Sequence, residues 1–130
     1  MESKTETRRI KITCEMEITL HVIGGKYKPL IIYFLIREGE KRFGEILRYL
    51  ETISQKTLTN QLRELEADGI VKREVFPEVP PRVEYQITEK GRSLYPVLEA
   101  MCEWGWSHPD DKYEMSSPQC GEKPEKAERP

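Results

Sequence analysis

The stretch from Ser54 to Leu62, SQKTLTNQL, is dense in amide and hydroxyl side chains. Ser, Thr and Asn compete with the helical backbone for hydrogen bonds, so helix stability alone does not explain their presence. Two cations, Lys56 and Arg63, accompany them, and no acidic residue occurs between Ser54 and Arg63. Amides and hydroxyls can bond base edges and phosphates, while cations bind phosphates. The segment therefore has the chemistry of a surface that meets a polyanion.

A helix over this segment separates the two kinds of side chain. At about 100° per residue, Leu58, Leu62 and Leu65 fall on one side, and the polar groups fall opposite or nearly so. Taken alone, this is the common pattern of a solvated helix face over a leucine stripe. A helix that lies in the major groove of DNA needs the same division. The elements around it must decide between these interpretations.

Four helices are expected in the first half of the chain. A short one, capped by Thr13, ends at Gly24-Gly25, and a nearly apolar one from Lys26 to Arg37 ends at Gly39. A brief third helix follows over 43–50, with Gly44 as a weak cap. The fourth runs over 54–68, with Ser54 as N-cap and Gly69 as C-cap. The third and fourth form a helix-turn-helix.

Two short strands and a last helix follow. Val71 and Val75, then Val83, Tyr85 and Ile87, alternate with polar residues on either side of the segment FPEVPPR, which predicts a hairpin with a long tip. The hairpin would act as a wing beside the fourth helix. One closing helix, capped by Thr88 and ending near His108, completes a mainly α winged helix-turn-helix.

The architecture favours DNA contact over an ordinary solvated face. Prolines stiffen the wing tip next to Arg82, which could reach a phosphate or the minor groove, although a stiffened turn explains the prolines equally well. Lys72 and Arg73 are open to the same two interpretations. The residues expected to contact DNA are Arg42, Ser54, Gln55, Lys56, Thr57, Thr59, Asn60, Arg63 and Arg82.

Several motifs together resemble the HxlR-type winged helix-turn-helix regulators. They are GGKYKPLIIYFL, KRFGEILRYL, ISQKTLTNQLRELEADGIVKREVFPEVPPRVEYQITEKGRSL and the closing EW, and they cover about Cys14 to Trp104. The resemblance implies a homodimeric, sequence-specific DNA-binding transcription regulator whose terminal helices form the dimer interface. Two departures, Tyr27 for the usual tryptophan and Gly44 for a serine or asparagine, affect packing and capping. Gly44 also lacks a side chain that could meet a phosphate.

Cys14 coincides with an N-terminal cysteine that senses oxidants or electrophiles in some members of that family. If Thr13 caps the first helix, Cys14 lies in its first turn near Arg8, Arg9 and Lys11, which would favour a thiolate. Glu15, which replaces the proline common after this cysteine, opposes that effect. An inert structural thiol is the alternative interpretation. Cys102 on the last helix and Cys120 in the tail receive no role.

Length, charge and the motifs present limit the classes of protein to which the chain can belong. The 130 residues fit one domain over 13–108, between a basic-leaning arm over 1–12 and a tail over 109–130 that is expected to be disordered. Residues 1–108 hold 17 acidic and 17 basic residues, so the overall charge does not by itself indicate a nucleic-acid-binding protein. No signal peptide, membrane span, metal site, cofactor motif or catalytic motif is recognised, so a cytoplasmic, non-enzymatic protein is expected.

Two alternatives to a simple DNA-binding regulator stay open at this stage. The first is a winged-helix module that binds another protein and leaves Lys56 and Arg63 as ordinary surface charges. The second is a redox or small-molecule switch in which DNA binding depends on Cys14. The operator, the regulated genes, the effector and the sign of regulation are not encoded in any recognisable motif.

Overall fold

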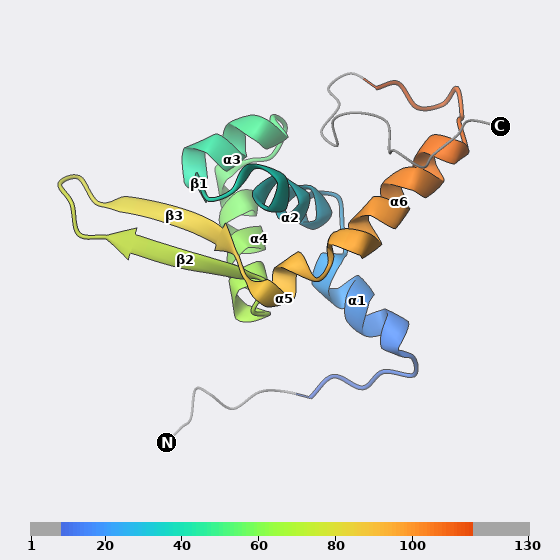
Figure 1. Ribbon diagram of the computed structural model, residues 1–130, viewed down its shortest axis with the longest axis horizontal. Coiled ribbons are helices and arrows are strands. Elements are labelled where there is room, and N and C mark those ends of the chain that lie inside the picture. Colours follow the sequence, from blue (N-terminus) through green and yellow to red (C-terminus); the bar gives the residue numbers. More distant parts are fainter. Residues whose placement is uncertain (1–8, 116–130) are drawn as a thin grey trace.

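A computed structural model describes residues 9–115 of the chain (Figure 1). The elements follow the order expected of a winged helix-turn-helix, with one short strand and one helix more than the sequence pattern predicts. The elements are α1 (Glu15–Ile23), α2 (Tyr27–Glu38), β1 (Lys41–Arg42), α3 (Phe43–Leu50), α4 (Gln55–Ala67), β2 (Val71–Phe76), β3 (Arg82–Ile87), α5 (Glu89–Arg92) and α6 (Tyr95–Ser107).

The core is built around α2, which the sequence predicts to be central. Ile31, Ile32 and Leu35 of this helix are fully buried. The leucine faces of α3 and α4 pack into the same cluster, together with Ile70 and Val71 after α4. This single core holds α3 and α4 in a fixed relation, so the helix-turn-helix is a rigid unit and not two tethered helices.

The wing belongs to a three-stranded antiparallel sheet in the order β1-β3-β2. In the hairpin, Arg73 pairs with Tyr85, Glu74 with Glu84, and Phe76 with Arg82. Lys41 of the two-residue strand β1 pairs with Tyr85 on the other edge of β3. Because successive side chains of a strand point to opposite faces, this register fixes which residues share each face of the wing.

The predicted closing helix is in fact two helices. Thr88 caps α5 as expected, since its hydroxyl accepts a hydrogen bond from the Gly91 N–H at 3.0 Å. The chain then breaks at Ser93 and resumes as α6, in whose first turn Pro96 lies. A proline lacks the N–H that would bond the carbonyl four residues back, so one continuous helix through Pro96 would lose a bond and crowd Arg92.

Two predicted helix caps are also wrong. Cys14, and not Thr13, is the N-cap of α1, and its sulfur accepts from the Met16 N–H at 3.4 Å. Arg42, and not Gly44, precedes the first residue of α3, and its backbone N–H donates to the Glu45 carboxylate at 2.8 Å. A guanidinium has no acceptor, so Arg42 can offer nothing in return and only half of a capping box forms.

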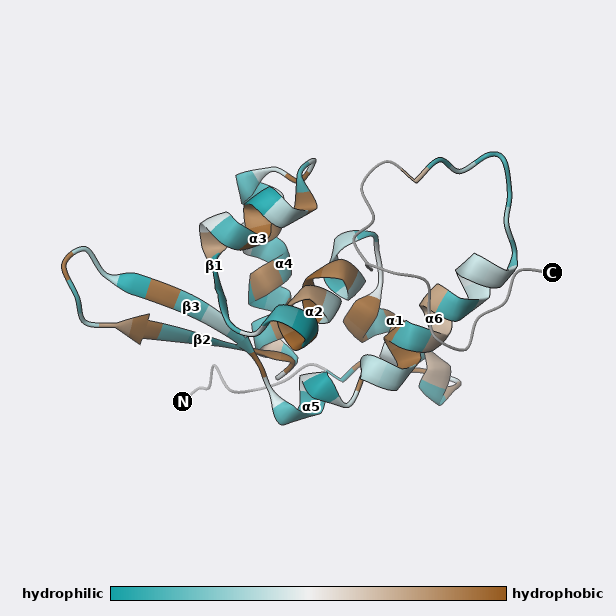
Figure 2. Cartoon of the chain, turned by 45° about the horizontal axis from the view of Figure 1, so that its top comes forward, coloured by the Kyte–Doolittle hydropathy of each residue, from teal (hydrophilic) through white to brown (hydrophobic). Residues whose placement is uncertain are grey.

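The molecule has two distinct ends. The β2–β3 hairpin projects from one end, and α1 and α6 lie at the other (Figure 1). Figure 2 shows hydrophobic segments on α2 inside the helical cluster and on α1 and α6 beyond it. None of the helices found in residues 9–115 is both long and apolar enough to cross a lipid bilayer.

Candidate nucleic-acid interface

Helix α4 divides by face as its sequence predicts. Leu58, Leu62 and Leu65 are almost wholly buried, at 0%, 2% and 0% exposure. The opposite side carries Lys56 and Asn60, which are exposed, and the helix lies at the surface beside the wing (Figure 1). The leucines therefore hold the helix to the core and leave the polar groups free to meet a partner.

The N-terminus of α4 is closed by two hydroxyl groups that bond each other. The Ser54 hydroxyl oxygen accepts from the Thr57 N–H at 3.1 Å and donates to the Thr57 hydroxyl at 3.0 Å. This capping arrangement satisfies one of the helix's open N–H groups. Ser54 and Thr57 thus have a structural role already, and any contact with a phosphate would use their remaining lone pairs or protons.

Most polar side chains along α4 after its cap make no intramolecular hydrogen bond or ion pair with another described residue. Within residues 9–115, the side chains of Gln55, Lys56, Asn60 and Arg63 have no hydrogen-bond or ion-pair partner. The Thr59 hydroxyl donates to the Gln55 carbonyl at 2.9 Å, which leaves its oxygen as an acceptor. These five residues, of which Thr59 is half-buried and the other four are exposed, form one stripe, called the α4 stripe below. It presents amides, a hydroxyl and two cations with no carboxylate between them.

The turn before α4 is anchored to the core helix. The Tyr27 and Thr52 hydroxyl groups lie 3.1 Å apart, within hydrogen-bond distance, and join the start of α2 to the turn between α3 and α4. A tryptophan, which the resemblance favours at position 27, would have no hydroxyl to offer here. The departure therefore changes how the turn is held and leaves the helix-turn-helix intact.

A groove separates the α4 stripe from the wing. It is lined by Thr59, Leu62, Arg63 and Glu66 of α4 and by Arg73 and Tyr85 of the sheet. Two cations from different elements, Arg63 and Arg73, thus share one groove with a single carboxylate. The sequence alone did not assign a role to Arg73, because it does not show which face of the strand lies beside α4.

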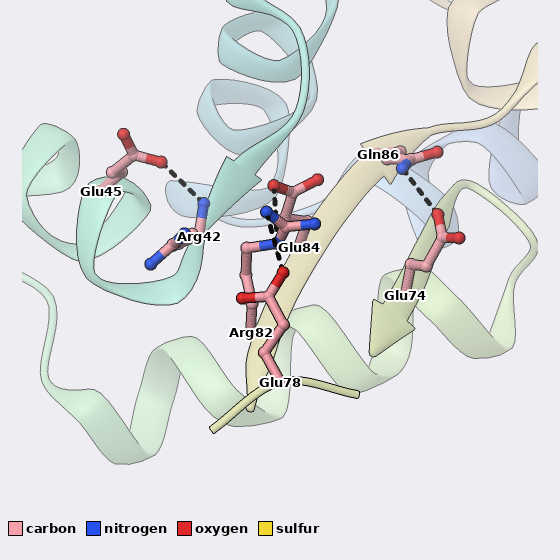
Figure 3. Close-up of polar contacts among 7 residues, drawn as sticks. All are labelled: Arg42, Glu45, Glu74, Glu78, Arg82, Glu84 and Gln86. Atoms are coloured by element: carbon pink, nitrogen blue, oxygen red, sulfur yellow. Dashed lines mark hydrogen bonds and ion pairs between the residues drawn. The ribbon is translucent and has the colours of Figure 1, made fainter. Parts of the chain in front are cut away.

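The structure holds Arg82 inside the wing. Its guanidinium lies 3.9 Å from the centre of the Phe76 ring. Its Nη1 lies 3.4 Å from the Glu78 carboxylate, and its Nε lies 3.6 Å from the Glu84 carboxylate, beyond hydrogen-bond distance (Figure 3). The contact with DNA that the sequence predicts for Arg82 stays a prediction, and the charge is already partly neutralised by these two acids.

Arg42 lies apart from the α4 stripe. It is exposed on β1 at the start of α3, and its Cα pairs with that of Glu84 on β3. Cross-strand neighbours share a sheet face, so Arg42 stands on the same face as the Arg82 cluster (Figure 3). The sequence-predicted residues therefore fall into two groups, one on and before α4 and one on the far face of the sheet.

Cys14 is exposed at the start of α1. Beside it, the Thr13 hydroxyl donates to the Glu17 carboxylate at 2.6 Å, and the Thr13 N–H donates to the same oxygen at 3.0 Å. These hydrogen bonds from Thr13 lower the pKa of Glu17, so this carboxylate stays ionised close to the thiol. Cys102 is half-buried on α6, and Cys120 lies outside the described residues.

No group of three His, Cys, Asp or Glu side chains that could hold a metal ion occurs among residues 9–115. Another groove is lined mainly by apolar residues of the arm and α1, among them Ile10, Ile12 and Ile18. The α4 stripe and its groove are thus the polar surface with the clearest ligand chemistry.

Comparison with known proteins decides the family. Residues 22–113 match the model of the HxlR-like helix-turn-helix family. The chain belongs to that family. The resemblance read from its motifs is confirmed. HxlR-type proteins are DNA-binding transcription regulators, and two relatives are named HTH-type transcriptional regulators.

Two relatives illustrate how far the likeness extends. An uncharacterised HTH-type transcriptional regulator, YybR of Bacillus subtilis, is 52% identical over 110 residues, covering 85% of this chain and 87% of its own length. Another, from Methanothermobacter thermautotrophicus, is 53% identical over 92 residues, covering 71% of this chain and 70% of its own. Each of these two relatives thus matches more than two thirds of the HxlR-type chain.

Solved structures agree with the fold. The redox regulator HypR in its oxidised form is 56% identical, with a TM-score of 0.70 over 75% of this chain and 99% of that one. Diamide-treated YodB from B. subtilis is 41% identical, with a TM-score of 0.62 over 72% of this chain and 93% of its own. The predicted mainly α winged helix-turn-helix is confirmed.

Proposed function

We propose that the protein is a homodimer that acts in the cytoplasm and binds a roughly palindromic duplex operator. Each protomer would place α4 in a major groove, with half-sites about 34–36 Å or a multiple apart. Occupying the operator would regulate transcription, most simply by obstructing polymerase. We propose no enzymatic activity, because the relatives of this chain are named transcriptional regulators.

The observation that carries this proposal is the α4 stripe. Its amides suit the edges of bases, and Lys56 and Arg63 suit phosphates. Exposed side chains without partners among residues 9–115 lose no intramolecular bond when they bind DNA. The leucines beneath fix the helix, so its backbone meets the duplex already ordered and the conformational entropy lost on binding is mainly that of the side chains.

The proposed dimer interface is the end of the molecule opposite the wing. On α1, Met16, Ile18 and Leu20 are 65%, 50% and 58% exposed. On α6, Met101 and Trp104 are 49% and 66% exposed. Large apolar side chains gathered on the surface mark an interaction site, and a second copy of the chain would cover them. The resulting pair would present two α4 helices related by two-fold symmetry.

Selection of bound sequences from random duplex DNA, followed by anisotropy titration of the winner at several salt concentrations, tests the proposal. We expect an enriched, roughly two-fold symmetric sequence and an affinity that falls steeply with salt. Light scattering should give a dimer, and Leu20→Glu should give a monomer with much weaker operator binding. If no duplex binds at low salt, the protein-interaction module becomes the better account.

A second candidate function is thiol-dependent control of the same DNA binding. Cys14 is exposed at the N-terminus of α1, within the surface proposed to dimerise, and the similar protein HypR is named a redox regulator. Oxidation at Cys14 would alter that surface. Operator binding by the wild type should then respond to diamide, and Cys14→Ser should not respond. Equal responses would remove Cys14 from the mechanism, with Cys102→Ser as the matched control.

A further inference from the structure

The two faces of the wing differ in charge. Register places Arg73 and Tyr85 on one face, together with Val75 and Val83 further out. It places the pairs Glu74 with Glu84 and Phe76 with Arg82 on the other. Alternation along each strand thus separates two arginines that lie close in the hairpin but point in opposite directions.

The sheet face that carries Arg73 lies beside α4. Arg73 and Tyr85 line the groove whose other wall is Thr59, Arg63 and Glu66 of α4. Arg73 is exposed, and within residues 9–115 its guanidinium has no ion-pair partner. Two unpaired cations therefore flank the edge of the α4 stripe that lies nearest the wing, against the one carboxylate of Glu66.

The face with Arg82 carries carboxylates as well as cations, and the carboxylates already hold polar partners. Glu74 accepts a hydrogen bond from the Gln86 amide at 2.9 Å, and Glu78 and Glu84 hold Arg82 (Figure 3). The Arg82 side chain is only 29% exposed. To reach a phosphate, this arginine would have to leave the Phe76 ring and both acids, and the vacated acids would then repel the phosphate.

We infer that Arg73 is the wing's phosphate contact on duplex DNA and that Arg82 is a positioning residue that holds the hairpin in shape. The inference rests on the proposed function and extends its footprint from α4 to β2. The wing would approach the duplex with the Arg73 face, which continues the positive edge of the α4 stripe. The face with Arg82 would point away from the phosphates.

Four single variants on one duplex test this assignment. Lys72 is the matched control for Arg73, because it is the adjacent exposed cation on the opposite strand face. Binding is measured by anisotropy as log K against log salt, and the wing is followed by hydrogen exchange of the β2 and β3 amides. Arg73→Ala removes one phosphate contact from each protomer of the proposed dimer, so the salt slope should become shallower by about 1.8, twice the value of about 0.9 for one contact. Lys72→Ala should leave the slope unchanged.

Arg82→Ala should keep the wild-type slope while β2 and β3 amides exchange faster, and Arg82→Lys should restore part of the protection. The assignment is overturned if Arg73→Ala and Lys72→Ala give the same salt slope. It is also overturned if Arg82→Ala is the one variant that makes the salt slope shallower. These failures differ from failure of the proposed function, in which the wild type itself shows no salt-dependent duplex binding.

Discussion

The Lys28 ammonium on α2 lies 2.6 Å from the Glu64 carboxylate on α4. The pair is asymmetric, because the Lys28 side chain is 9% exposed and that of Glu64 is 58% exposed. The bond fixes the rotation of α4 against the core helix. It also neutralises one of the carboxylates in the second half of the helix proposed to enter the major groove.

This asymmetry predicts unequal costs for removing either partner. Glu64→Ala leaves a nearly buried ammonium without its acceptor and should lower the free energy of unfolding by about 1–3 kcal/mol. Lys28→Met keeps the apolar stem and leaves only a solvent-screened carboxylate, so the loss should be smaller. Urea unfolding of both variants checks this, with Glu66→Ala as the exposed control. A larger loss for Lys28→Met would contradict the prediction.

Alanine substitutions at two residues of the α4 stripe, Lys56 and Asn60, should change DNA binding in different ways. Lys56→Ala should weaken binding to all duplexes alike and reduce the salt slope by about one phosphate contact per protomer. Asn60→Ala should keep the slope, lose about 1–3 kcal/mol per half-site of the selected operator and relax the preference at one base pair of each half-site. Anisotropy on the operator and on single-base variants separates the two. Arg92→Ala on α5, away from the stripe, should change neither quantity.

The fold was largely predictable because its signals are local. Ser54 and Gly69 bracket α4 with side-chain and backbone chemistry that can be read in the sequence, and the leucine spacing gives its buried face. The division of α5 from α6 was also readable, since Pro96 is a helix-start signal, but the apolar periodicity across it suggested one helix. Strand β1 was missed because two residues carry no periodicity.

The candidate site was only partly predictable, for a different reason. The α4 stripe follows from one helix, so the sequence contains all that is needed to find it. Arg73 and Arg82 depend on strand register and on what packs against each sheet face, which are non-local. Lys28 was likewise hidden in an apolar run, and its partner lies 36 positions later in the chain.

Ser54 offers a way to separate capping from DNA contact. Ser54→Ala removes the bond to the Thr57 N–H and should cost about 1 kcal/mol of stability. Ser54→Asp keeps a capping oxygen and adds a negative charge at the helix N-terminus, so stability should recover while duplex binding falls through repulsion. Thermal melting and anisotropy are measured on both. Full DNA binding by Ser54→Asp would place Ser54 away from any phosphate.

Tyr95 makes stability depend on alkaline pH. Its hydrogen bond to Glu99, together with partial burial, raises the pKa of this phenol to about 12. The neutral form is therefore favoured in the folded protein, and its contribution is complete below the unfolded value near 10. Stability should fall as pH rises from about 10 toward 12. Thermal melts across that range should show a weaker decline in Tyr95→Phe, and Tyr113→Phe, 76% exposed, should behave as wild type.

Gly91 is where α5 packs most closely on the sheet. A Cβ at this position would press on the Ile70 carbonyl oxygen and lie 2.7 Å from Cδ1 of Ile87. One of these contacts is backbone, so the neighbours cannot simply rotate away, and Gly91→Ala should destabilise the protein by about 1–3 kcal/mol. Gly44→Ala is the control, because nothing lies within 4 Å of a Cβ there. Urea unfolding measures both. Equal stability would mean that α5 shifts freely, and the hairpin that it supports would then not be held in one position beside α4.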